Sequence, residues 1–258
     1  MIVSKTIYFF IFLFTLAFAA ELRVYRDTSI SKFVDDDDAV HLWSAVATFG
    51  ESPSDGQLVK LAEDAWRLMI DQSIDEGIDR ERRPTVMAAF GMQTKPNEWT
   101  VYLASSARGS QSLVYNYDTR TQQTCGSIWD TVPSELGNVI SRCSRHPTDR
   151  HMFDAKCGEI NALINYYVRT GESVASLAGK DGRMMAWRGF LDDNTEYEGG
   201  HIIPPCWDNT ETNFGCSDVL QKYATTNIRI VNKRTQGESY ECNLPQSVDF
   251  QPVFPDYA

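Results

Sequence analysis

In the second half of the chain, segments with a helical spacing of apolar residues alternate with short apolar runs typical of β-strands. The pattern predicts helices at about residues 155–169 and 216–223, and strands at 183–187 and 227–231. Strands that alternate with helices imply a mixed or parallel central sheet covered by helices, because each helix must bury its apolar side against a partner. This feature restricts the chain to the α/β class.

The preceding region predicts a long helix followed by a β-hairpin. Ser54 is a suitable N-cap, and the apolar positions of residues 58–69 follow the helical period closely. Two apolar runs, at residues 85–90 and 99–104, are separated by the turn-forming sequence of residues 95–97. We expect these two runs to pair as a hairpin.

Residues 20–53 are predicted to form a helical extension in front of this region. Four consecutive acids, Asp35 to Asp38, suit the positive end of a helix. The apolar residues that follow them recur every three positions, and they are Val40, Trp43, Val46 and Phe49. A divalent-cation site is the alternative, but it needs acids that converge on one point rather than acids adjacent in the chain.

Residues 1–19 have the pattern of a secretory signal peptide. A single basic residue, Lys5, is followed by an apolar run from Ile7 to Ala17, and Ala17-Phe18-Ala19 has the small residues that a signal peptidase reads. The alternative is a membrane anchor, but the run is well short of the roughly 20 residues that cross a bilayer. We therefore expect a secreted, extracellular protein without membrane association once the signal is removed.

The composition is that of an acidic globular protein. Among 258 residues, 42% are hydrophobic and 23% are charged, which excludes a disordered, collagen-like or coiled-coil chain. No Pro/Gly/Ser-rich linker divides the chain, so we expect one main domain over residues 54–235 and an irregular, proline-containing tail over 236–258. The net charge of −11 disfavours loose binding to the phosphate backbone of nucleic acids.

For a secreted protein, disulfide formation is the first interpretation of the six cysteines. In an oxidising compartment, six cysteines form three disulfides by default. Cys125 and Cys143 can bridge a modest loop, which leaves Cys242 unpaired, so other pairings among these three stay open. A disulfide within the remaining three cysteines also stays open.

Those remaining three cysteines occur where a loop or strand leads into a helix. Cys157 begins one predicted helix, whereas Cys206 follows two prolines and Cys216 begins the next helix. A helix N-terminus carries a partial positive charge that lowers the pKa of a thiol and makes it a better metal ligand. Three thiolates occupy three of the four tetrahedral positions on Zn²⁺ and leave the fourth to water, as in catalytic zinc sites.

Glu159 lies two residues after Cys157, close to the predicted metal but outside its ligands. A carboxylate in this place can take a proton from activated water and return it to a leaving group. Glu159 is therefore the predicted catalytic residue.

These residues resemble the signature of the zinc-dependent nucleobase deaminases, which is His- or Cys-x-Glu on one helix and Pro-Cys-x-x-Cys at the next. Cys157-Gly158-Glu159 is similar to the first part, and Pro205-Cys206 with Cys216 is similar to the second. The cysteine-first pattern resembles the cytidine deaminase-like superfamily, in its secreted, toxin-like branch, over residues 54–232. One departure is that nine residues separate Cys206 from Cys216, where the family has two.

The resemblance implies a three-layer α/β/α fold with a mixed central sheet and Zn²⁺ held by Cys157, Cys206 and Cys216. It also implies hydrolytic deamination of a cytosine- or adenine-type base, with release of ammonia. The substrate would be a free nucleoside or a base in nucleic acid.

Three further residues are candidates for the substrate pocket. Trp207 directly follows a predicted ligand and can stack on a flat heterocycle. His151 and His201 precede predicted ligands by six and five residues, respectively. The alternative function is a secreted effector or binding protein that uses a deaminase-like or disulfide-stapled scaffold without catalysis.

Overall fold

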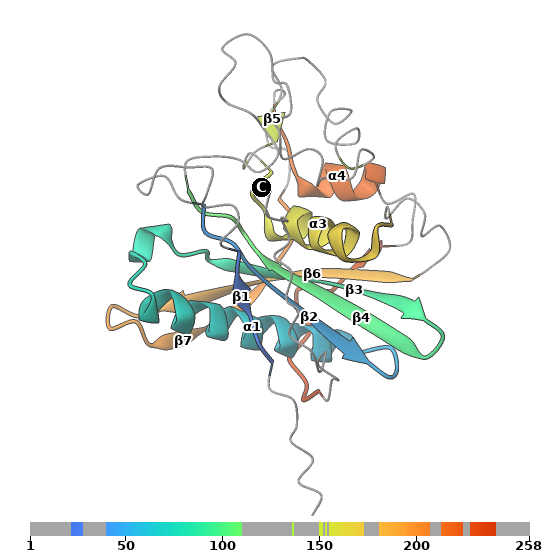
Figure 1. Cartoon of the computed structure of the whole chain (residues 1–258), viewed down its shortest axis with the longest axis horizontal. Coiled ribbons are helices and arrows are strands. Elements are labelled where there is room, and N and C mark those ends of the chain that lie inside the picture. Colours follow the sequence, from blue (N-terminus) through green and yellow to red (C-terminus); the bar gives the residue numbers. More distant parts are fainter. Residues whose placement is uncertain are drawn as a thin grey trace, which may run out of the picture.

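The structure is a computed structural model of the chain (Figure 1). The residues it describes are 22–27, 40–109, 136, 150–151, 153, 155–172, 181–206, 213–223 and 228–240. The predicted features outside the described residues are the signal peptide at 1–19, the acids at 35–38, Cys125, Cys143, Trp207, Cys242 and the end of the tail at 241–258. None of the described helices combines the length and the apolar character needed to cross a membrane.

The described residues form a seven-stranded sheet, a two-stranded sheet and three α-helices. The strands are β1 (Tyr25–Arg26), β2 (Trp43–Phe49), β3 (Val86–Lys95), β4 (Glu98–Ser105), β5 (Arg150–His151), β6 (Gly182–Leu191), β7 (Tyr197–Ile203), β8 (Asn213–Phe214) and β9 (Ile228–Ile230). The helices are α1 (Asp55–Asp75), α3 (Gly158–Thr170) and α4 (Cys216–Tyr223), with the short 3₁₀ helix η3 (Arg80–Arg82).

The large sheet is built from antiparallel neighbours. Its strands lie in the order β1-β2-β4-β3-β6-β7, and each pair along this path is antiparallel. Among the described strands of this sheet only β9 differs, because its three residues pair in parallel with the start of β6. We therefore correct the prediction of a mixed, cytidine deaminase-like α/β/α fold: the sheet is antiparallel apart from the short β9.

The departure from the predicted topology has a local cause, since β6 continues into a hairpin and not into a helix. The Glu196 N–H donates to the Asp192 carboxylate at 2.7 Å, and the Asp192 N–H donates to the Glu196 carbonyl at 2.9 Å. Between them Thr195 has a φ of 69°, in the left-handed region that tight turns use. A hairpin reverses the chain, so β7 runs antiparallel to β6.

The predicted helical extension over residues 20–53 is also wrong where the chain is described, because residues 43–49 form β2. Its residues pair with β4 from Ser44 opposite Ala104 to Phe49 opposite Trp99. Tryptophan, valine, threonine and phenylalanine all favour a pleated strand over a helix. The three-residue spacing that indicated a helix is thus outweighed by strand propensity and by the backbone hydrogen bonds that β4 offers.

The predicted long helix and the predicted hairpin are confirmed. α1 begins with a capping box, in which the Gln57 N–H donates to Ser54 Oγ at 3.1 Å and the Ser54 N–H donates to Gln57 Oε1 at 2.8 Å. β3 and β4 are antiparallel neighbours, with Phe90 opposite Tyr102.

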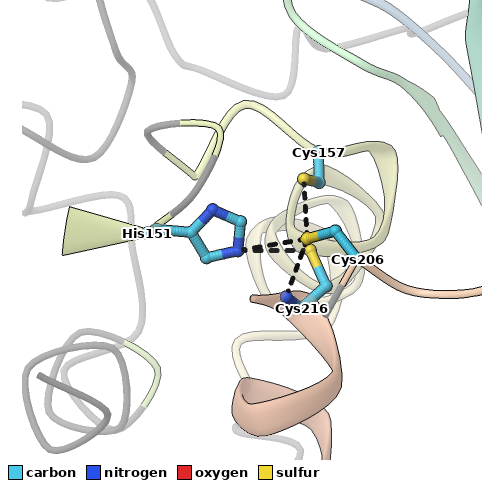
Figure 2. Close-up of side chains that lie close together, drawn as sticks. All are labelled: His151, Cys157, Cys206 and Cys216. Carbon is cyan, nitrogen blue, oxygen red and sulfur yellow. Dashed lines mark hydrogen bonds between the residues drawn. The ribbon is translucent and has the colours of Figure 1, made fainter. Parts of the chain in front are cut away.

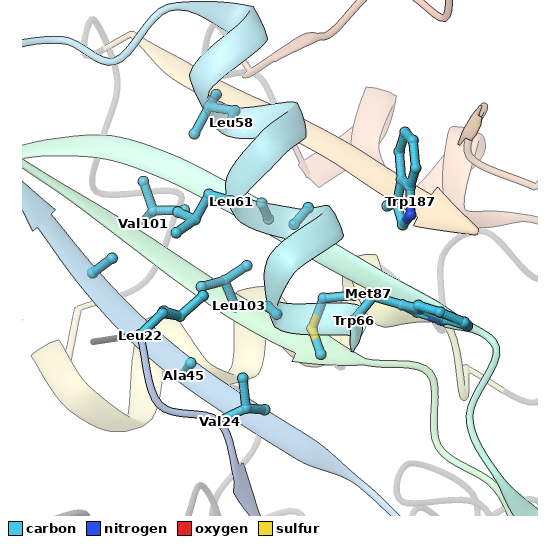
Figure 3. Close-up of a cluster of buried hydrophobic side chains, with 14 of the residues drawn as sticks. Leu22, Val24, Ala45, Leu58, Leu61, Trp66, Met87, Val101, Leu103 and Trp187 are labelled. Carbon is cyan, nitrogen blue, oxygen red and sulfur yellow. The ribbon is translucent and has the colours of Figure 1, made fainter. Parts of the chain in front are cut away.

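Both faces of the sheet are apolar, and helices cover both (Figure 1). We call them the α1 face and the α3–α4 face. Alternate residues of a strand point to opposite faces, so Met87 and Ala89 of β3 pack with α1, whereas Ala88 and Phe90 pack with α3. Figure 3 shows the core of the α1 face, where Leu61 and its neighbours on α1 lie on the sheet.

Candidate metal centre

Four side chains that can bind a metal lie together on the α3–α4 face (Figure 2). They are His151 of β5, Cys157 directly before α3, Cys206 after β7 and Cys216 at the start of α4. Their donor atoms all lie within 4.8 Å of one another. His151 and Cys216 are buried, and Cys157 and Cys206 are half-buried.

The distances between the donor atoms fit a tetrahedral zinc ion. Zn–S bonds of about 2.3 Å at tetrahedral angles place two sulfurs about 3.8 Å apart, and Cys157 Sγ and Cys206 Sγ are 3.7 Å apart. His151 Nε2 lies 3.3 Å from Cys216 Sγ and 3.9 Å from Cys206 Sγ. Two sulfurs in a disulfide are only about 2.05 Å apart, so these cysteines are free thiols. Thiolate and imidazole ligands favour zinc over magnesium or calcium.

Cys157 is placed by the close seating of the first turn of α3 on the sheet. It is the N-cap of α3. A Cβ atom on the next residue, Gly158, would lie 3.0 Å from the Ala104 carbonyl oxygen and 3.0 Å from the Ala88 Cβ. Glycine therefore allows a contact that any larger residue would push apart.

Two buried asparagines fix α3 to the sheet backbone. Asn161 Nδ2 donates to the Ser105 carbonyl at 2.9 Å, and Asn165 Nδ2 donates to the Leu103 carbonyl at 2.9 Å and to the Ala45 carbonyl at 3.2 Å. Leaving a buried polar group unpaired costs about 1–3 kcal/mol. These bonds therefore set the rotation of α3, and with it the direction of the side chains in its first turn.

The nine residues between Cys206 and Cys216 do not separate the two side chains. The Cys216 N–H donates to Cys206 Sγ at 3.0 Å, and the Ser217 N–H donates to the Cys206 carbonyl at 3.1 Å. The chain thus returns to Cys206 before α4 begins, and the long spacing is compatible with one shared site.

His151 reaches the cluster through the two-stranded sheet. β5 pairs in parallel with β8, with His151 opposite Phe214, and Cys216 follows shortly after. The Phe153 N–H donates to His151 Nδ1 at 3.2 Å. A backbone N–H can only donate, so Nδ1 accepts and Nε2 carries the proton that faces the sulfurs. Predicted as a pocket residue, His151 instead contacts the cysteines.

The three thiols share their negative charge unequally. The pKa of Cys206 lies far below its ordinary value, first because Cys157 donates a hydrogen bond to its sulfur and then because Cys216 does. The pKa of Cys157 is raised mainly by its hydrogen bond to Cys206, and the pKa of Cys216 is raised mainly by burial. Among the three thiols, Cys206 is therefore the one that ionises most readily, as metal binding requires of a thiol.

Glu159 is buried beside the cluster, with an exposed fraction of 4%. Burial raises its pKa to about 7, although a hydrogen bond from its own backbone N–H acts in the opposite direction. Glu159, Cys157 and Cys206 line one cavity of about 420 Å³. His151 and Cys216 are not among the residues that line it.

The other predicted pocket residues are not brought to the cluster within the described part of the chain. His201 is exposed on β7, where its ring centroid lies 5.2 Å from that of Phe190, and it does not line the cavity. Trp207 is outside the described residues. Sequence reasoning missed three cations that do line the cavity, Arg108, Lys156 and Arg188. They lie far apart in the chain and no motif marks them, so only the fold brings them together.

Comparison of the chain with protein-family models, with curated proteins and with solved structures gives no match. The similarity to the zinc-dependent deaminases therefore depends on the cysteines and on Glu159 alone. What the structure adds is a cluster of one histidine and three cysteines that can bind a metal.

Proposed function

We propose that this protein is a secreted, zinc-dependent hydrolase that removes an amino group from a nucleobase-type ring and releases ammonia. One observation carries the proposal. The buried carboxylate of Glu159 lines the same cavity as the thiols of Cys157 and Cys206. A buried acid beside a cavity is costly for folding and typical of a catalytic site, whereas a purely structural metal site has no use for it.

Zn²⁺ held by Cys157, Cys206 and Cys216 would act as a Lewis acid that activates water near neutral pH. Glu159 supplies the proton transfer: it accepts a proton from the attacking water and passes it to the departing amine. The ring carbon gains the oxygen of water and loses its nitrogen as ammonia. The second proton of the water is transferred to the ring nitrogen, so the atoms and charges of the reaction balance.

The hydrogen bonds of His151 support an open site. Its Nδ1 atom accepts from the Phe153 N–H, so its Nε2–H donates toward the sulfurs of Cys206 and Cys216. A histidine in this state stabilises thiolates as a hydrogen-bond donor and does not occupy a ligand position. The fourth position of a tetrahedral metal then has no protein ligand, which is the arrangement of catalytic zinc sites.

A second function is favoured by the closeness of all four donors. With His151 as the fourth ligand, the cluster becomes a closed His/Cys₃ site of the structural kind. The protein would then be a secreted binding or effector protein in which zinc only stabilises the fold.

An ammonia-release assay decides between the two functions. Zinc-loaded protein is incubated with cytidine, adenosine, their monophosphates, and single-stranded DNA and RNA. We expect turnover of at least one substrate, and Glu159→Gln should lower kcat by about 10²- to 10⁴-fold without loss of zinc. Glu172→Gln, an exposed glutamate after the other end of α3, is the matched control. Tightly bound zinc without ammonia from any substrate would refute the hydrolase and support the structural site.

A further inference from the structure

The cavity beside Glu159 is lined by an unusual set of charges. Arg108, Lys156 and Arg188 all line it, and Glu159 is the only acidic residue among the described residues that do. The whole chain has 24 basic and 35 acidic residues and a net charge of −11. The cavity therefore has a local excess of positive charge although the whole chain is acidic. Such an excess favours a negatively charged ligand in this cavity.

Two of these cations have no carboxylate partner among the described residues. The Arg108 guanidinium donates to the Thr85 hydroxyl at 3.2 Å. Arg188 is exposed on β6, opposite Val86 of β3, and none of the ion pairs found in the described part of the chain includes it.

Two arginines elsewhere in the described part of the chain pair with acids. Arg229 donates through both terminal nitrogens to the Asp55 carboxylate, at 2.5 and 2.6 Å. Arg26 pairs with Glu76 at 2.6 Å. Arg108 and Arg188 line a cavity without an ion pair to any described carboxylate, so both can bind an anionic ligand there.

Backbone bonds hold two of the cations at the cavity. Arg108 exchanges backbone hydrogen bonds with His41, at 2.7 and 3.0 Å. The carbonyl of Lys156 accepts from the Ala107 N–H at 2.8 Å, and its Nζ donates to the Gly109 carbonyl at 2.8 Å. The positive wall is therefore largely positioned before any ligand arrives, which lowers the entropy cost of binding.

The same cavity also has an apolar wall. Phe153 lines it with an exposed fraction of 54%, one of the few large hydrophobic side chains among the described residues to be so exposed. Ile203 and Pro204 line it as well. An exposed aromatic face next to apolar residues suits the flat ring of a nucleobase.

We propose that this cavity binds a nucleoside monophosphate, with the ring beside Phe153 and Glu159 and the phosphate held by Arg108 and Arg188. The inference rests on the proposed function and names its substrate class. Guanidinium groups bind phosphate through paired, charge-assisted hydrogen bonds. The volume of about 420 Å³ falls in the range of small-molecule sites. The net charge of −11 repels a long polyanionic strand, so a free nucleotide is favoured over nucleic acid.

Binding measurements on zinc-loaded Glu159→Gln test the substrate class without turnover. Calorimetry compares cytidine with its 5′-monophosphate and adenosine with its 5′-monophosphate. We expect each monophosphate to bind at least about ten-fold more tightly than its nucleoside, with a preference that weakens as salt rises. Adding Arg188→Gln should reduce the preference, because only Arg108 then contacts the phosphate, and should change nucleoside affinity by less than about two-fold. Adding Arg234→Gln, an exposed arginine outside the cavity, should change neither.

Each alternative outcome has a definite meaning. Equal affinity for nucleoside and monophosphate, or tighter binding of a single-stranded oligonucleotide, overturns the inference. The inference is overturned, and the proposed hydrolase stands, if ammonia is released from the nucleoside and its monophosphate at equal kcat/KM and Arg188→Gln changes neither value. A phosphate preference that depends on Arg188, without ammonia from any substrate, overturns the hydrolase while the binding inference stands. Zinc content and thermal unfolding show whether Arg188→Gln is folded, and Arg108→Gln is the second variant.

Discussion

Both faces of the sheet have an apolar core, but the outer part of the α3–α4 face depends on further contacts. On the α1 face, a helix of 21 residues lays ten buried residues on the sheet, and nearly all of them are apolar. On the α3–α4 face, α3 is anchored by asparagine bonds to the sheet, whereas α4 has eight residues and β5 and β8 have two each. The first face is a hydrophobic core, and the outer part of the second is organised around sulfur and nitrogen atoms.

This difference shows where a metal contributes to folding. A helix of eight residues is marginal in water, and a two-residue strand pair adds little. Cys216 at the start of α4 and His151 on β5 both point to the same cluster (Figure 2). We therefore infer that metal binding orders this outer part, whereas the α1 face folds through burial of apolar surface.

Removal of the metal should have the largest effect on stability, and it should affect the α3–α4 face more than the α1 face. Zinc binding contributes about 10–16 kcal/mol to the folding of zinc-finger peptides, so loss of zinc should outweigh what a short helix contributes on its own. After chelation, or in Cys216→Ser, we expect amide protection to be lost at residues 150–151, 155–157 and 213–223 but kept in α1 and β3. Hydrogen exchange measured by mass spectrometry reports both regions in one experiment.

Ser217→Ala is the matched control for that experiment, because it alters the neighbouring side chain and leaves the sulfur in place. It should bind zinc and protect α4 like the unaltered protein. Equal loss of protection in α1 and α4 after metal removal would contradict the division of the molecule into two differently held faces.

A substitution that leaves a cavity in the core of the α1 face should have the next largest effect on stability, and it should leave the metal site unchanged. Leu61 is fully buried in α1, at 0% exposure. In urea titrations of zinc-loaded protein, Leu61→Ala should lower the free energy of unfolding by about 3 kcal/mol. Its affinity for zinc should stay unaltered. Asp71→Ala, at an exposed position of the same helix, should change stability by less than about 0.5 kcal/mol. A drop in zinc affinity for Leu61→Ala would show that the faces are coupled.

The parts of the fold that the sequence predicts are those with local signals. The capping box at Ser54 and the helical period after it are properties of adjacent residues, as is the turn between β3 and β4. The thiols of Cys157, Cys206 and Cys216 are likewise marked by the helices that they begin or precede. Local chemistry is enough for these elements because tertiary contacts agree with it.

The parts that the sequence does not predict depend on contacts between distant segments. β2 became a strand because β4 offers it hydrogen bonds, although the spacing of its own apolar residues indicates a helix. His151 joins the cluster through its pairing with the segment before Cys216. No spacing rule links these residues, so only the folded chain shows that they meet.

Acid should have the smallest effect, and it tests the segment just before β2, where His41 is buried. Burial, with Arg26 and Arg82 nearby, lowers the pKa of His41 to about 4. Between about pH 6.5 and 4 the unfolded chain binds a proton that the folded chain does not, so stability falls as the pH falls through this range. We expect a loss of about 1–2 kcal/mol relative to His41→Gln in urea titrations at successive pH values.

Loss of metal at low pH affects the unaltered protein and His41→Gln alike, so the difference in stability between them isolates the effect of His41. The backbone of His41 pairs with that of Arg108, which lines the cavity. If the stability of the unaltered protein and of His41→Gln falls in parallel with pH, a neutral His41 does not stabilise this wall of the cavity.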